Sequence, residues 1–151
     1  MKEGIEYFPL DVCLDDKFEL IEAEFGLTGF AVVVKLLQKI YGQFGYYCEW
    51  NIEVALLFAK RIGLGGSVVS EIVAASIRRG IFDKTMHDRY GILTSAGIQK
   101  RYFEAVSRRK IVKIKKRTSL FLAPKFRKMY TFLRKMYTFP AKMLTFPNKV
   151  K

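Results

Sequence analysis

The chain is poor in the residues that build most catalytic and metal sites. Its 151 residues include two cysteines and one histidine. Cys13 and Cys48 have neither a CxxC spacing nor a histidine nearby, so we expect no metal site and no disulfide framework. The glycines at 63, 65 and 66 lack the frame of a phosphate-binding loop, and no cofactor is expected. Without paired catalytic carboxylates, the pattern predicts a protein that is not an enzyme.

Long apolar runs and an N-terminal leader are also missing. The longest apolar run, at 29–34, stops at Lys35, far short of the roughly 20 residues that span a bilayer. The first residues, MKEG, do not have the pattern of a signal peptide. Together with the few cysteines, these features predict a cytoplasmic protein with no integral membrane contact.

Acidic residues are almost absent from the last third of the chain. Residues 1–100 carry 11 Lys and Arg against 13 Asp and Glu, whereas residues 101–151 carry 16 against the single acid Glu104. The last third therefore has a net charge of +15, and the whole chain one of +13. Because cations that neutralise phosphates release condensed counterions, the expected partner is nucleic acid, either single- or double-stranded DNA. An anionic membrane surface is the alternative.

Apolar periodicity and capping residues predict one mostly helical domain at 1–110. The expected elements are helices at 16–25 and 28–41, a strand at 46–50, helices at 51–62 and 67–79, strands at 81–83 and 91–94 around a polar loop at 84–90, and a helix from 95 onward. A helix-turn-helix followed by a two-stranded hairpin is the winged-helix arrangement. The predicted fold class is therefore α+β, a winged helix with a C-terminal helix and a basic tail.

Residues 111–151 form the basic tail, which we expect to be poorly ordered. Three similar seven-residue units, KMYTFLR, KMYTFPA and KMLTFPN, fill positions 128–148. Pro140 and Pro147 interrupt any long helix, which argues against a coiled coil. Three interpretations stay open: a solvated polycation, a segment of cations and stacking aromatics suited to single-stranded nucleic acid, and a membrane-surface segment.

Candidate DNA contacts lie around the predicted helix-turn-helix and just after the domain. They are Lys60, Arg61, Ser67, Ser70, Arg78, Lys84, Arg89, Arg108, Arg109, Lys110, Lys113, Lys115, Lys116 and Arg117. Serine hydroxyls and cations can bind phosphates, but Glu71 on the second helix of the motif repels the DNA backbone. That helix also has no residue placed for bidentate base recognition, so the pattern favours positioning over sequence specificity. His87 is expected to be an exposed residue of the wing loop.

Six stretches carry a family resemblance. They are EYFPLD (6–11), DDKFELIEAEFGLTGFAVVVKLLQKIY (15–41), YYCEW (46–50), LLFAKRIG (56–63), RGIFDK (79–84) and ILTSAGIQKRYFEA (92–105). Together they resemble a domain family long catalogued as of unknown function, found at the N-terminus of phage and prophage proteins related to DnaD-type replication-initiation proteins. The resemblance implies a winged-helix domain, used partly for self-association, and a role in DNA replication. A self-associating protein-interaction module and a transcriptional regulator are the alternative functions.

Overall fold

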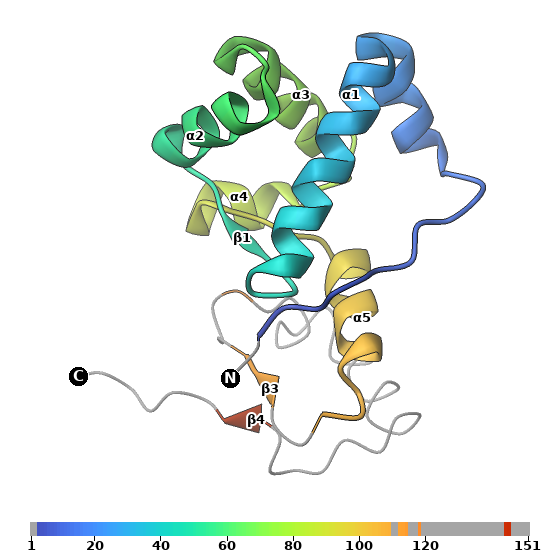
Figure 1. The fold of residues 1–151 in the computed structure, drawn as a ribbon, viewed down its shortest axis with the longest axis vertical. Coiled ribbons are helices and arrows are strands. Elements are labelled where there is room, and N and C mark those ends of the chain that lie inside the picture. Colours follow the sequence, from blue (N-terminus) through green and yellow to red (C-terminus); the bar gives the residue numbers. More distant parts are fainter. Residues whose placement is uncertain (1–2, 110–111, 115–117, 119–143, 146–151) are drawn as a thin grey trace.

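The computed structural model describes residues 3–109, 112–114, 118 and 144–145 (Figure 1). Its elements are α1 (Asp16–Gly42), β1 (Cys48–Glu49), α2 (Ile52–Ile62), α3 (Gly66–Arg78), α4 (Lys84–Tyr90), β2 (Ile92–Leu93), α5 (Ala96–Ala105), β3 (Val112–Lys113) and β4 (Leu144–Thr145). β1 pairs with β2 in antiparallel register, and β3 pairs with β4 in parallel register. The mostly helical α+β class predicted from the sequence is confirmed.

The long helix α1 is the element on which the others pack. Asp15 begins it by accepting a hydrogen bond from the Phe18 N–H at 3.3 Å. Its buried apolar side chains recur every three or four residues, and α3 packs along it (Figure 1). Gly26, where the sequence predicted a break, has φ 69° and ψ −163°, so the helix kinks there. The two predicted helices therefore form one element bent at the expected residue.

The helices α2 and α3 lie where the sequence predicted a helix-turn-helix. Asn51 caps α2, its side-chain oxygen accepting from the Val54 N–H at 2.9 Å, and Gly63 ends the helix. The turn leads directly into α3, which begins one residue earlier than predicted. α2 packs against α3, so the pair shares one apolar face. The helices predicted at 51–62 and 67–79 are thus confirmed.

The hairpin predicted to follow α3 is wrong in two respects. The expected loop at 84–90 is helix α4, and β2 pairs with β1 instead of with residues 81–83. Asp83 accepts a hydrogen bond from the Met86 N–H at 2.8 Å, and this cap begins the helix that Gly91 ends. Met86 is buried, so α4 adds to the core. A backbone hydrogen bond from the Asp83 N–H to the Thr94 carbonyl, at 2.7 Å, joins the two predicted strands.

A buried polar network joins β1, β2 and α5. Gln99 donates from Nε2 to Thr94 Oγ1 at 3.0 Å and to the Thr118 carbonyl at 2.8 Å. The hydroxyls of Tyr46 and Thr118 lie 2.9 Å apart. Buried amides and hydroxyls need such partners, so this network fixes α5 against the strand pair.

The core continues past the predicted boundary at residue 110. Val112 and Ile114 are 4% and 6% exposed and belong to the same hydrophobic cluster as α1 and α5, and Thr118 joins the polar network. A separate tail at 111–151 stays a prediction, because most of those residues lie outside the described part of the chain.

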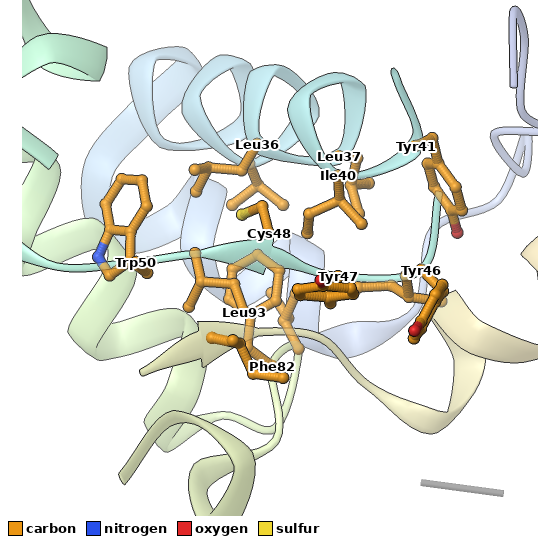
Figure 2. Close-up of a cluster of buried hydrophobic side chains, with 14 of the residues drawn as sticks. Leu36, Leu37, Ile40, Tyr41, Tyr46, Tyr47, Cys48, Trp50, Phe82 and Leu93 are labelled. Carbon is orange, nitrogen blue, oxygen red and sulfur yellow. The ribbon is translucent and has the colours of Figure 1, made fainter. Parts of the chain in front are cut away.

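Cys48 lies in the middle of the core, near Leu36 and Leu93 (Figure 2). Burial raises the pKa of its thiol from 9.0 to about 12. We expect a thiol reagent at pH 8 to modify the exposed Cys13 in the native protein and Cys48 only in denaturant. In the unfolded chain the Cys48 thiol would lose its proton at a lower pH than in the folded protein. The free energy of unfolding should therefore fall as pH rises from about 9 towards 12. Mass spectrometry of the labelled protein measures how much of each thiol is modified. Equal modification of Cys13 and Cys48 in the native protein would contradict the labelling prediction.

Candidate nucleic-acid interface

The candidate contacts on α2 and α3 are exposed. Lys60 and Arg61 lie in the last turn of α2, and Ser67 and Ser70 lie on α3. Glu71, also on α3, is exposed beside them, as the sequence predicted. The surface therefore offers two cations and two hydroxyls, with one carboxylate that would repel phosphate.

A groove of about 420 Å³ lies between the amino ends of α2 and α3 and the helix α4. Trp50 and Ala55 line it with Ser70 and His87, and its surface is mostly apolar. Ile52 and Leu56 on its α2 side are 88% and 64% exposed. Exposed aliphatic side chains beside a groove are typical of a surface that contacts another molecule.

The residues of α4 form a small charged cluster. Asp88 is ion-paired with Lys84 and accepts a hydrogen bond at 3.1 Å from His87 Nδ1 when that nitrogen is protonated. The hydrogen bonds from Lys84 and from His87 lower the pKa of the Asp88 carboxyl. His87 is half-buried on a helix, so the expectation of an exposed loop histidine is wrong. Arg89 on the same helix is exposed.

Arg78 is held by a carboxylate from another helix. Glu24 on α1 accepts from Arg78 at 3.4 Å and from Arg79 at 3.0 Å, and Lys17 donates to the Gly80 carbonyl at 3.5 Å. These contacts fasten the amino-terminal part of α1 to the end of α3. Glu24 partly neutralises Arg78, which lowers its value as a phosphate contact.

The cations after α5 have different surroundings. Arg109 donates to the backbone carbonyls of Glu3 at 3.2 Å and Gly4 at 2.7 Å, which ties the N-terminal segment to the end of the domain. Arg108 is exposed. Lys113 lies in β3, and Lys110, Lys115, Lys116 and Arg117 lie outside the described residues.

The structure thus brings Ser70 and His87 together at one groove and separates them from Arg109. Sequence reasoning missed Glu24 as the partner of Arg78, because the pair is 54 positions apart and no local pattern links them. It also missed α4, for which a signal was present. Asp83 precedes Met86 by the capping distance, and Lys84 and Asp88 have the i,i+4 spacing of a helical ion pair.

Within the described ranges, no group of three or more acidic, histidine or cysteine side chains could hold a metal ion. None of the helices in those ranges is both long and apolar enough to cross a membrane.

Comparison with known proteins finds a matching family model and a phage-related relative. A family model described as Lin1244/Lin1753-like, N-terminal, matches residues 7–98. The phage-related protein Lin1244/Lin1753 of Listeria innocua serovar 6a is 46% identical over 112 residues, which are 73% of this chain and 36% of that protein. The chain therefore spans about a third of the relative's length. No solved structure matches.

Proposed function

The chain belongs to the Lin1244/Lin1753-like, N-terminal family, and on that premise we propose that it is a non-enzymatic winged-helix protein that binds DNA in phage replication initiation. The charge distribution carries the proposal. Residues 101–151 have a net charge of +15, and a polyanion is the partner that such a segment would bind most strongly.

The arrangement of the strands supports a winged helix. β1 lies between the first helix and the helix-turn-helix, and it pairs with β2, with Cys48 opposite Leu93. The hydrogen bond from Asp83 to Thr94 places residues 81–83 beside the same ladder. We infer a winged-helix domain whose wing contains the helix α4 in place of an extended loop.

The contacts proposed for DNA are exposed cations on α2, on α4 and just after α5, together with the tail. On the body these are Lys60, Arg61, Arg89 and Arg108, with the hydroxyls of Ser67 and Ser70. Glu71 and the paired Arg78 make base-specific recognition by α3 unfavourable, so binding depends on phosphate contacts.

Salt dependence tests the proposal. If about five to eight cations meet phosphates, log K for duplex DNA should fall against log salt with a slope of roughly −4 to −7. Replacing the four tail residues Lys128, Lys135, Lys142 and Lys149 by Gln should flatten the slope by up to about four. Fluorescence anisotropy of labelled duplex DNA, titrated with the parent chain and with the tail variant across a salt series, measures the slope.

A matched control replaces four body lysines outside the proposed interface, Lys17, Lys35, Lys39 and Lys100, by Gln. It removes the same charge and should leave the slope nearly unchanged. Equal slopes for the parent and the tail variant would show that the tail does not contact phosphates.

A self-associating interaction module is the second candidate, and the groove beside Ile52 and Leu56 favours it. Two strongly exposed aliphatic side chains are a liability on a surface that meets only water and DNA. Sedimentation at increasing protein concentration tells the two candidates apart: DNA binding by a protein that remains monomeric supports the first, and association without DNA binding supports the second.

A further inference from the structure

A second, smaller cavity lies where the N-terminal segment crosses the carboxyl end of α1 and meets α5. Its volume is about 160 Å³. Phe8, Leu14, Phe18 and Leu37 supply the apolar part of its lining, and polar side chains, among them Tyr41 and Arg101, supply a part of similar size. None of its lining residues is among the candidate DNA contacts, so this cavity is independent of the proposed function.

The start of the N-terminal segment is held in place by contacts at Glu3, Gly4, Ile5 and Phe8. The Ile5 N–H donates to the Tyr41 carbonyl at 2.8 Å, and the Phe8 ring stacks on Tyr41 with centroids 4.7 Å apart. Farther back, Arg109 and Tyr102 donate to the carbonyls of the first described residues. Phe8 and Tyr41 are therefore positioned before any ligand arrives, which lowers the cost of binding.

Two hydrogen-bond donors face this cavity without a protein acceptor. Tyr41 is 1% exposed, and its hydroxyl has no hydrogen-bond partner among the described residues. Burial raises the pKa of the Tyr41 phenol, and the nearby Arg101 guanidinium opposes this rise. The guanidinium and the phenol oxygen are not placed for a regular hydrogen bond. Arg101 is half-buried and forms no ion pair within the described part of the chain. A buried donor without a partner is unfavourable, and an acceptor from a ligand would remove that penalty.

The geometry points to a binding site for a small monocarboxylate with an apolar body. The carboxylate would accept from Arg101 and Tyr41, a charge-assisted arrangement that proteins use for such groups. The rest of the ligand would lie against Phe8, Phe18 and Leu37. An engineered cavity of about 150 Å³ holds benzene, so the volume suits a six-membered ring.

The acidic residues of the cavity sharpen the choice of ligand. Asp11 and Asp15 line it, and Asp15 already accepts the Phe18 N–H as the cap of α1. Both carboxylates oppose an anionic ligand, but they are exposed and screened by water, and Arg101 offsets one negative charge on the ligand. A second negative charge on the ligand would have no second cation to offset it. Inorganic phosphate has no apolar part to place against Phe8, Phe18 and Leu37, and it carries more than one negative charge at neutral pH.

Benzoate is the probe that tests this site. Titrated into the isotope-labelled full chain, it should shift the amide NMR signals of lining residues with a dissociation constant of roughly 1–10 mM, a range typical of weak small ligands. Replacing Arg101 by Gln should weaken binding about tenfold or more, because a charged hydrogen bond is lost. The neighbouring Lys100→Gln removes the same charge at an exposed position and should change the affinity less than about twofold.

Tyr41→Phe removes only the unpartnered hydroxyl. It should weaken benzoate binding by about two- to tenfold, as the loss of one neutral donor predicts. Its melting temperature without ligand should equal or exceed that of the parent, which separates a lost contact from a lost fold. Benzamide, phthalate and inorganic phosphate should each bind more weakly than benzoate. Equal affinity for benzamide, no effect of Arg101→Gln, or no shifts with benzoate would overturn the assignment.

Discussion

Replacing Gly45 by Ala should destabilise the protein by about 3–5 kcal/mol, as the sum of backbone strain and overpacking. Gly45 has φ 91°, in the left-handed region that side chains rarely adopt. A Cβ there would lie 1.9 Å from Cε2 of Tyr102, whose ring is 2% exposed. The ring would have to move, and its hydroxyl would lose the 2.8 Å hydrogen bond to the Glu3 carbonyl.

Two glycines on α1 separate the effect of backbone strain from that of overpacking. Gly26 has φ 69° and no atom within 4 Å of its virtual Cβ, so its Ala variant should lose only the strain, about 1–3 kcal/mol. Gly42 has neither a positive φ nor a neighbour within 4 Å, and Ala there should be neutral or stabilise by up to about 1 kcal/mol.

Urea unfolding of the three variants, with the slope m compared, measures these free energies. The expected order of stability is the Gly42 variant, then Gly26, then Gly45. A Gly45 variant as stable as the Gly26 variant would mean that the Tyr102 ring moves aside freely, and the packing of α5 against this turn would then be looser than the structure indicates.

Local signals in the sequence were sufficient to predict α1, α2, α3 and α5, whereas α4 was predicted as a loop although its capping signal was present. Asn51 and Ser95 each cap a helix by accepting the N–H three residues later, and both caps are readable without knowledge of the fold. The kink at Gly26 was visible for the same reason, since a glycine inside a periodic apolar pattern marks a break. Features that depend on neighbours within four residues leave a signal in the sequence, and α4 was missed because its signal was not used.

Contacts between distant residues could not be predicted in this way. The pairing of β1 with β2 joins residues 45 positions apart at Cys48 and Leu93, and the strand-like residues 81–83 offered a nearer but wrong partner. The cations available to the candidate nucleic-acid interface were harder still to predict. Arg78 and Arg109 looked like free cations, and only the fold places Glu24 beside one and backbone carbonyls beside the other.

The end of the folded domain follows from similar long-range contacts and leads to the second large effect. A chain ending at residue 110 should be less stable than one ending at residue 120 by about 2–4 kcal/mol, the scale of losing two buried apolar side chains and two buried hydrogen bonds minus the entropy regained by the chain. Val112 and Ile114 would leave the core.

A single substitution tests the contribution of the buried hydrogen bonds to that loss of stability. Thr118→Val in the full chain keeps the volume and removes the hydroxyl that lies 2.9 Å from that of Tyr46. It should cost about 1–2 kcal/mol, because a buried hydroxyl is left without this partner. The backbone carbonyl of residue 118 still accepts from Gln99, so the rest of the network is kept.

Thermal and urea unfolding of the three chains, full-length, 1–120 and 1–110, decide where the domain ends. We expect the 1–120 chain to unfold within about 1 kcal/mol of the full chain, as for removal of a peripheral segment. Equal stability of the 1–110 and 1–120 chains, together with an unaffected Thr118→Val variant, would place the boundary at 110 as the charge pattern predicted. A 1–110 chain that is less stable than the 1–120 chain would mean that the basic segment begins inside the folded domain. Val112, Ile114 and Thr118 would then anchor its first residues against β1 and α5. The cations that follow would then start from a fixed point on the body.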